Sequence, residues 1–369
     1  MKQSVGFIGW RGMVGSVLLN RMYEEKDLEK IKPVFFSTSQ SGKKVSLLNV
    51  LENQVLQDAY SLDHLKEMNI IISCQGGSYT EKMYFDLRKS GWKGFWIDAA
   101  STLRMHTDSV IVLDPINKDY IIQSINCGIK TFVGGNCTVS LMLLALGGLF
   151  KENLIDSINV STYQAASGAG SKYILEMLHQ MKTVSDFIQK DLLNTSLSIL
   201  DIEKKVTHIT KSNTFPRENF KVPLIGSLIP WIDIPMEHGQ TREEWKIGVE
   251  TNKILNTSVF IPIDGICVRI GVLRCHSQSF TIKLKKNITI KNIEEILLNN
   301  NKWIQIIRNN EKNSKKYLSP VHVSGTLFIP TGRIRKLSIS NKHISIFSVG
   351  DQLLWGAAEP LRRMLKLLI

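Results

Sequence analysis

The stretch Val5-Gly6-Phe7-Ile8-Gly9-Trp10-Arg11-Gly12-Met13-Val14-Gly15 decides the fold of the N-terminal part of the chain. Its first residues predict a buried strand, and a helical pattern begins at Met13 and runs to Glu25. A tight turn of glycines between strand and helix lets a pyrophosphate approach the N–H groups at the helix start. The spacing departs from the usual G-x-G-x-x-G pattern, so a glycine turn without a ligand is the alternative. The strand context favours a dinucleotide site.

Beyond this turn, short apolar strands alternate with helices. Strands are expected at 33–36, 69–73, 94–97, 110–113 and 130–133, with a helix at 81–89. This alternation predicts an α/β fold with a doubly wound parallel sheet. A strand at 158–166 and a helix at 173–190 come next, followed by strands at 258–263, 266–274 and 278–285. Successive long strands indicate a mixed or antiparallel sheet in a second domain. The polar segment 299–319 is expected to be a mobile surface insert, and 352–368 an amphipathic helix.

The end of the second strand discriminates between cofactors. It reads Phe35-Phe36-Ser37-Thr38-Ser39-Gln40 and holds no carboxylate. NAD-binding folds usually carry Asp or Glu at this point to bind the ribose 2′-hydroxyl. Hydroxyl groups can donate to a 2′-phosphate, and Arg11 could add a positive charge. The sequence therefore predicts NADP rather than NAD, with an ordinary Ser/Thr loop as the alternative.

The main chemical signal is Gly134-Gly135-Asn136-Cys137-Thr138-Val139-Ser140. Two glycines end a strand, Asn136 is a good N-cap, and Cys137 falls in the first helical turn. That position lowers a thiol pKa through the helix dipole, so we expect a reactive thiolate. The alternative for any cysteine is a small buried residue, which suits Cys74, Cys127, Cys267 and Cys275 better.

A nucleophilic cysteine needs a base, and His276 is the best candidate among eight histidines. It lies between two predicted strands, although a surface or core histidine is the usual fate of a lone His. Arg269 could hold a carboxylate or simply make a strand-face salt bridge. Gln164 closes a strand before the small-residue loop Ala165–Gly170, which either admits a ligand or only connects two elements. Arg104 and Lys246 are possible anion contacts, although each singly reads as a surface charge.

Composition bounds the remaining possibilities. The 369 residues carry a net charge of +13. The basic residues are spread along the chain, which favours an enzyme with anionic ligands over a nucleic-acid-binding protein. No apolar run is long enough for a membrane span, and the N-terminus does not read as a signal peptide. Five irregularly spaced cysteines indicate reduced thiols, no metal site and a cytoplasmic location.

Taken together, these residues resemble the aspartate-semialdehyde dehydrogenases of enteric and related bacteria. The resemblance runs from end to end, except for 42–57 and 299–316, which read as loops. The stretches that carry it are GFIGWRGMVGS, FFSTSQ, IISCQGG, WIDAAS, GGNCTVSLM, YQAASGAG, REEWK, ETNKIL, CVRIGVLRCHSQ and GDQLLWGAAEPLRRM.

The resemblance implies a fold, an assembly and an activity. The expected fold is a Rossmann-type domain at 1–134 and about 353–369, with an α+β catalytic and dimerisation domain of mixed sheet at about 135–352 of a homodimer. The expected activity is reversible, NADPH-dependent reduction of L-aspartyl 4-phosphate to L-aspartate 4-semialdehyde and phosphate through a cysteine thioester. That step serves the biosynthesis of lysine, threonine, methionine and diaminopimelate. No nucleic acid or membrane partner is implied.

The resemblance also implies residue roles. Cys137 is the nucleophile, His276 the acid/base group, and Gln164 orients the substrate or acyl intermediate. The amino-acid end is bound by Arg269 and Glu243, and the phosphate by Arg104 and Lys246. The cofactor site is lined by Gly9, Arg11, Gly12, Met13, Val14, Thr38, Ser39, Gln75, Ser167, Gly168 and Gln352.

Three rival classes fit parts of the sequence. A Cys–His hydrolase needs no nicotinamide cofactor, which the glycine turn argues against. Reductases of glyceraldehyde phosphate or N-acetylglutamyl phosphate share the thioester chemistry, and a substrate panel separates them. A basic nucleic-acid-binding protein predicts steeply salt-dependent affinity for DNA or RNA.

Overall fold

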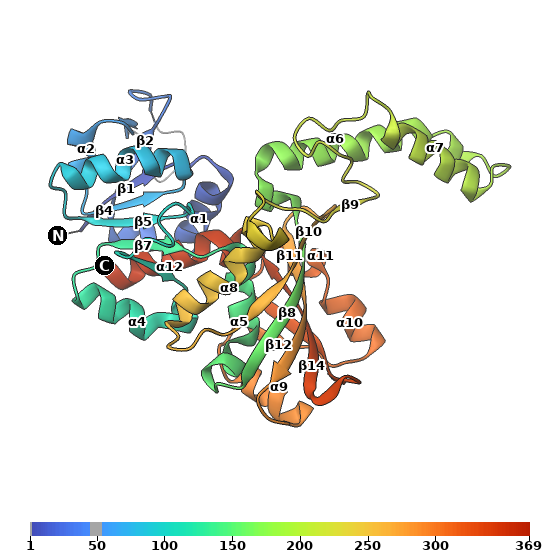
Figure 1. The fold of residues 1–369 in the computed structure, drawn as a ribbon. Coiled ribbons are helices and arrows are strands. Elements are labelled where there is room, and N and C mark those ends of the chain that lie inside the picture. Colours follow the sequence, from blue (N-terminus) through green and yellow to red (C-terminus); the bar gives the residue numbers. More distant parts are fainter. Residues whose placement is uncertain (1, 45–53) are drawn as a thin grey trace.

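The structure is a computed structural model that describes residues 2–44 and 54–369 (Figure 1). Its first sheet is parallel throughout, in the order β3-β2-β1-β4-β5-β7-β6. The strands are β1 (Ser4–Ile8), β2 (Lys32–Ser37), β3 (Gln57–Asp58), β4 (Ile70–Ser73), β5 (Phe95–Asp98), β6 (Ser109–Val112) and β7 (Thr131–Gly134).

Helices cover both faces of this first sheet. One face packs against α1 (Met13–Glu24), α4 (Asp114–Asn126) and α12 (Glu359–Leu368), and the other against α2 (Leu62–Lys66) and α3 (Gly77–Lys89). Central strands such as β4 are therefore buried on both sides, which explains their continuous apolar runs. The predicted doubly wound, Rossmann-type sheet is confirmed, with strand positions within about one residue of those expected.

The second sheet is mixed, in the order β12-β13-β14-β11-β8-β10-β9. Its strands are β8 (Ile155–Gln164), β9 (Leu228–Ile229), β10 (Ile263–Ile270), β11 (Cys275–Leu284), β12 (Ile304–Ile306), β13 (Ile329–Leu337) and β14 (Ser340–Asp351). The pairs β8–β10 and β12–β13 are parallel, and the others are antiparallel. The predicted mixed sheet is confirmed.

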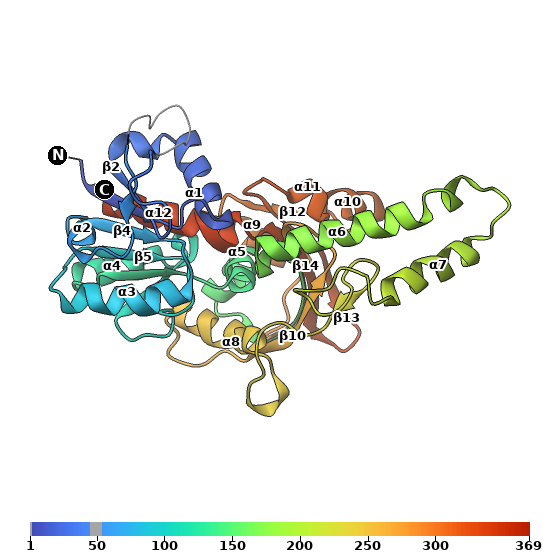
Figure 2. The same ribbon diagram turned by 90° about the horizontal axis from the view of Figure 1, so that it is seen from above.

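One face of the second sheet carries the largest hydrophobic core. It packs against α5 (Cys137–Lys151), α8 (Arg242–Leu255) and α9 (Ile290–Leu298). Helices α10 (Glu311–Tyr317) and α11 (Pro320–Val323) lie near β13 and β14. Helices α6 (Ser171–Ile188) and α7 (Ile199–Lys211) form an arm that points away from both sheets (Figure 2). Short 3-10 turns occur at η1 (Asp27–Lys30), η2 (Ala166–Ala169), η3 (Asp191–Leu193) and η4 (Glu237–Gly239).

The chain returns to the first sheet at its C-terminal end. After β14 it forms a π-helical turn, η5 (Leu354–Ala358), and then α12, which packs beside α1. The expectation of one regular helix over 352–368 is therefore wrong in its first turn. None of the described helices is long and apolar enough to cross a bilayer.

Two further expectations are wrong, each for a local reason. Residues 258–262 form no strand, because Pro262 has no N–H and the Ile261 N–H bonds to the Asn252 side chain at 2.8 Å. The segment 299–319 is ordered, with β12 paired to β13 and α10 capped by Asn310. The expected loop at 42–57 lies partly outside the described residues, and it ends in the short strand β3.

Candidate active site

Cys137 is the first residue of α5, as the sequence predicts. Two glycines end β7, and the Asn136 side chain caps the helix by accepting from the main-chain N–H groups of Thr138 (2.9 Å) and Val139 (3.3 Å). This cap fixes the path of the chain immediately before the sulfur.

Three neighbouring strands bring their ends to the sulfur. Gln164 ends β8, Arg269 lies near the end of β10, and His276 is the second residue of β11. Since β8 pairs with both β10 and β11, these side chains meet at one end of the sheet. The expected assembly of residues more than one hundred positions apart is present, although His276 lies inside a strand and not in a turn.

Cys137 and His276 are in direct contact. The Cys137 Sγ lies 3.2 Å from the His276 Nε2. The Ala165 N–H donates to the His276 Nδ1 at 3.0 Å, and the Arg269 Nη1 donates to the Ala165 carbonyl at 2.6 Å. Because Nδ1 accepts a hydrogen bond, the neutral ring carries its proton on Nε2, directed toward the sulfur.

The ionisation of this pair differs from the sequence-based expectation. Burial raises the pKa of Cys137 to about 12, and Glu243 adds to this effect against the opposing charges of Arg269, Arg104 and Lys246. Burial, together with Arg269, holds the pKa of His276 well below its ordinary value. Both shifts run against the lowered thiol pKa that the helix start predicts, because desolvation outweighs the effect of the helix start.

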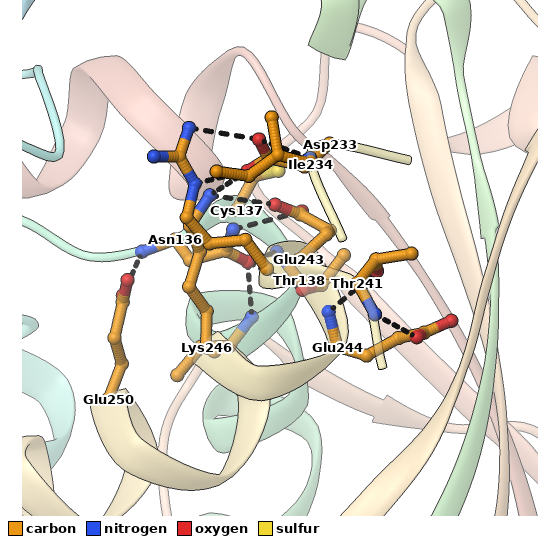
Figure 3. Close-up of polar contacts among 12 residues, drawn as sticks. Asn136, Cys137, Thr138, Asp233, Ile234, Thr241, Glu243, Glu244, Lys246 and Glu250 are labelled. Carbon is orange, nitrogen blue, oxygen red and sulfur yellow. Dashed lines mark hydrogen bonds and ion pairs between the residues drawn. The ribbon is translucent and has the colours of Figure 1, made fainter. Parts of the chain in front are cut away.

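Glu243 is the centre of the polar contacts around Cys137 (Figure 3). Its Oε1 accepts from the Asn136 Nδ2 at 2.9 Å and from the Gln164 Nε2 at 3.0 Å. Its Oε2 accepts from the Lys246 Nζ at 3.2 Å. These donors, with Lys246 foremost among the charges, hold the pKa of Glu243 below its ordinary value despite burial. The Gln164 Oε1 is buried without a hydrogen-bond partner among the described residues and remains available to a ligand.

A cavity of about 390 Å³ opens beside the sulfur. Six residues named from the sequence line it: Cys137, Gln164, Gly168, Glu243, Lys246 and Arg269. Ala169, from the small-residue loop, also lines it, whereas the sequence interpretation missed the other walls, which are Tyr173, Asn219, Phe220, Ile229, Trp231, Ile232 and Asp233. Most of these follow the α6–α7 arm in sequence and carry no local motif, so only the folded chain reveals them.

The two expected phosphate ligands are already paired with carboxylates. The Lys246 Nζ bonds to Asp233 at 2.7 Å as well as to Glu243. Arg104 is buried, and its Nη1 bonds to Glu250 at 3.1 Å, but it does not line the cavity. Taken singly, each residue reads in the sequence as a surface charge, but in the structure neither is one. Glu250 follows Glu243 and Lys246 at helical spacing on α8, a periodicity from which it could have been found.

The residues expected to bind the cofactor form two groups. The first lies at the carboxyl ends of the adjacent strands β2, β1 and β4, where nucleotides bind in such sheets. Gly9 has φ +72°, and a methyl group there would come within 2.5 Å of the Cys74 carbonyl carbon. Arg11 contacts Gln40 and the Ser37 Oγ, beside Thr38 and Ser39. Gly12, Met13 and Val14 start α1, and Gln75 follows β4.

The second group lies next to Arg269 and His276. The Gln352 Nε2 donates to the Ser167 Oγ at 2.7 Å, and Gly168 packs against Arg269 and His276. The turn η5, directly after Gln352, packs on both α1 and α5. A methyl group at Gly356 would lie 2.6 Å from the Cys137 Cβ. This close packing connects the glycine turn with the sulfur.

The remaining cysteines differ from one another. Cys267 and Cys275 are buried and Cys74 partly so, in line with the structural interpretation, whereas Cys127 at the end of α4 is exposed. None forms a disulfide in the described part of the chain. Within residues 2–44 and 54–369, no three or more His, Cys, Asp or Glu residues converge as metal ligands do.

Two family models match the chain in succession. The NAD binding domain of semialdehyde dehydrogenase matches residues 4–124, and the semialdehyde dehydrogenase dimerisation domain matches residues 146–355. The chain therefore belongs to the semialdehyde dehydrogenases, with one family model over each of its two sheets.

Similar solved structures indicate which semialdehyde dehydrogenases this chain resembles. Aspartate semialdehyde dehydrogenase from Francisella tularensis is 50% identical, covers 99% of each chain and has a TM-score of 0.95. The chain belongs to the aspartate-semialdehyde dehydrogenase family. Aspartate semialdehyde dehydrogenase II from Vibrio cholerae, complexed with ASA, shares the fold at 23% identity, covering 100% of this chain and 98% of that one, with a TM-score of 0.78. The enzyme from Candida albicans with NADP does so at 15% identity, with the same coverage and a TM-score of 0.65.

Proposed function

We propose that this protein catalyses the reversible, NADPH-dependent conversion of L-aspartyl 4-phosphate to L-aspartate 4-semialdehyde and phosphate. The observation that carries the proposal is the Cys137–His276 contact at 3.2 Å, on the wall of a cavity with both cationic and anionic groups. Family membership supports the substrate. The reaction would serve amino-acid biosynthesis, toward lysine, threonine, methionine and diaminopimelate.

Cys137 acts as the nucleophile. Its sulfur forms a bond to the acyl carbon, the carbon–oxygen bond to phosphate breaks, and the phosphate leaves with the thiol proton. A thioester on Cys137 remains. The Thr138 and Val139 N–H groups are taken up by the Asn136 cap, so the Cys137 N–H at the start of α5 is the donor suited to stabilise the oxyanion that develops during this step. In the reverse direction the sulfur adds to the aldehyde, and phosphate later attacks the thioester.

His276 is the acid/base group of these steps. Its Nε2 proton is directed toward the sulfur, where it can stabilise a thiolate or the oxygen of an adduct on Cys137. Burial lowers the pKa of the ring and so favours its neutral form. The neutral ring can donate a hydrogen bond from Nε2 and can exchange a proton with the reacting groups as charge develops.

The cavity charges match the two ends of the substrate. Arg269 suits the α-carboxylate, and Glu243 with the unpartnered Gln164 Oε1 suits the α-ammonium group. Lys246 and Arg104 would attract the phosphate, Lys246 by exchanging Asp233 for the ligand. The cavity volume of about 390 Å³ suits a small amino-acid derivative.

The residues at the glycine turn fit a nicotinamide dinucleotide. The bare backbone at Gly9 leaves no space for a side chain, and Arg11 lies beside Ser37 at the end of β2. We propose NADP as the cofactor, held by the two groups described above. When bound, it supplies or accepts the hydride. A distant relative of the same fold, from Candida albicans, was solved with NADP.

We also propose a homodimer, with domain limits at 1–134 plus about 353–369 and at 135–352. The match to a dimerisation domain supports this assembly, as do exposed apolar side chains on the second sheet and the arm, among them Ile266, Leu175 and Leu178. Five cysteines without a disulfide suit a reducing, cytoplasmic location.

Replacement of the nucleophile tests the function. In Cys137→Ala, phosphate-dependent NADP reduction with aspartate semialdehyde should fall by about 10⁴-fold or more, because no thioester can form. NADP affinity, measured by fluorescence titration, should stay close to that of the wild type. Cys127→Ala, which changes an exposed cysteine at the end of α4, is the matched control and should keep its activity. Near-normal turnover by Cys137→Ala would exclude the scheme.

A further inference from the structure

Glu250 is a buried carboxylate beside the nucleophile that the sequence motifs do not assign. It lies on α8 and is only 2% exposed. Its Oε2 accepts from the main-chain N–H of Asn136 at 2.7 Å, and its Oε1 accepts from the Arg104 Nη1 at 3.1 Å. A buried charge is costly unless it is fully paired, and here both oxygens have partners.

Together, Glu250 and Arg104 hold the turn that leads to the sulfur. The Arg104 Nε donates to the Gly134 carbonyl at 2.7 Å, at one end of the turn. Glu250 binds the Asn136 N–H at the other end, and Cys137 is the next residue. Gly134 and Gly135 provide little resistance to bending, so these contacts supply the rigidity that the turn lacks.

A second carboxylate on the same helix face also binds Asn136. Glu243 lies seven residues before Glu250, two helical turns away, and accepts from the Asn136 Nδ2. Figure 3 shows Glu243 and Glu250 of α8 reaching Asn136 from two sides. The main-chain nitrogen and the side-chain nitrogen of Asn136 are thus fixed by one rigid element, while its Oδ1 caps α5.

Glu250 also controls the charge of Arg104. The other contact of Arg104 is with the Gly134 carbonyl, and the Arg104 Nη2 forms no hydrogen bond with any described residue. Glu250 is its ion-pair partner and reduces its net attraction for a phosphoryl group. The other charged or titratable groups close to the sulfur are Glu243 and Lys246 from α8, Arg269 from β10 and His276 from β11.

We propose that Glu250 is a positioning residue of this site: it holds the Asn136–Cys137 turn in place and, through its pairing with Arg104, limits the attraction of Arg104 for phosphate. The proposal rests on the proposed function, in which Cys137 is the nucleophile and Arg104 contacts the phosphate.

Glu250→Gln tests both parts. The amide can still accept from Asn136, but Arg104 loses its counter-charge. The pH at which iodoacetamide alkylation of Cys137 is half-maximal should therefore fall below that of the wild type. The KM for phosphate should also fall, and kcat should drop by about tenfold, because a neutral amide accepts from the Asn136 N–H more weakly than a carboxylate and holds the turn less firmly. Glu250→Asp keeps the charge but is too short for both contacts, so its alkylation midpoint should stay while kcat falls.

Glu244→Gln is the matched control. Glu244 is a buried carboxylate on the same helix, and it accepts from the main-chain N–H groups of Thr241 and Cys267. Its loss should lower the thermal midpoint without moving the alkylation midpoint or the phosphate KM. Alkylation is read by mass spectrometry and needs no turnover, so this readout stands if the proposed activity is absent.

Three results would overturn the proposal. The first is a Glu250→Gln variant with wild-type alkylation midpoint and phosphate KM. The second is a shift of the same size in Glu244→Gln, which would mark a general effect of damage to α8. If Glu250→Gln does not fold, Glu250→Asp decides alone, and wild-type kcat and alkylation rate in that variant would show that the contacts have no positioning role.

Discussion

The surroundings of Cys137 and the glycine turn after β1 are the two ends of the proposed reaction site, and they are built in opposite ways. Around Cys137 the polar side chains are buried and hold one another, as Glu243 holds Asn136, Gln164 and Lys246. At the turn, the shape comes from the backbone, and the side chains of Arg11 and Gln75 are exposed. The polar side chains of the first region are therefore held in place before any ligand binds. The side chains of Arg11 and Gln75 in the second region face solvent instead.

This difference predicts where substitutions act. A change near Cys137 should disturb several linked groups and reduce the chemical rate strongly. A change at the glycine turn should alter nucleotide binding and leave the chemistry of the bound complex nearly intact. Exceptions to this separation would show that η5, which packs on both α1 and α5, couples the two ends.

After Cys137→Ala, the largest effect should come from His276→Asn. Asparagine keeps a side-chain donor but cannot take up a proton, so kcat/KM should fall by about 10²- to 10⁴-fold. The pH dependence of kcat/KM on the acid side, below the ordinary histidine pKa of 6.5, should flatten, because the group that titrates there beside the sulfur is lost. Nucleotide affinity should not change. A pH–rate profile identical to that of the wild type would contradict the acid/base role.

The same variant should change how the free energy of unfolding depends on pH. The pKa of His276 in the folded chain lies well below its ordinary value of 6.5. Below about pH 6.5 the unfolded chain binds a proton that the folded chain does not, so the contribution of His276 to stability is present at neutral pH and is lost as the pH falls. His276→Asn should therefore lose less unfolding free energy than the wild type between about pH 7 and pH 5 in urea titrations.

An intermediate effect is expected from Gly9→Ala. At φ +72° and with the Cys74 backbone 2.5 Å from the new methyl group, the turn must shift. NADP affinity should weaken by about tenfold or more, while kcat at saturating NADP stays near the wild-type value. Gly128→Ala is the matched control, since Gly128 has φ +87° with open space around it after α4. Equal losses of nucleotide affinity in both variants would assign the effect to backbone strain in general.

Much of the fold could be predicted from the sequence, because its signals are local. Strand β4 is a short continuous apolar run, and Asn136 is an N-cap directly before Cys137. The errors also have local causes. An alternating pattern at 258–263 is interrupted by Pro262, and the asparagines after Leu298 act as turn and cap residues, as Asn301 does for Trp303.

The burial of the site side chains and their ion pairs could not be predicted from the sequence. The raised pKa of Cys137 depends on desolvation, and Gly356, from the far end of the chain, packs directly against Cys137. The Arg104–Glu250 pair joins residues 146 positions apart. A motif indicates a candidate nucleophile, but its pKa depends on contacts that only the folded chain creates.

The smallest effect should come from Arg11→Ala, which changes an exposed side chain of the glycine turn. Arg11 contacts Ser37 and Gln40 at the end of β2, where a 2′-phosphate would lie in the proposed complex. Loss of one charge-assisted contact should reduce the ratio of kcat/KM for NADP to that for NAD by about tenfold, with little change for NAD itself. Arg308→Ala removes an equally exposed arginine far from the turn and should leave the ratio unchanged. If Arg11→Ala lowers both values alike, Arg11 shapes the turn and does not recognise the 2′-phosphate, and the preference for NADP must then come from the hydroxyl groups of Ser37, Thr38 and Ser39.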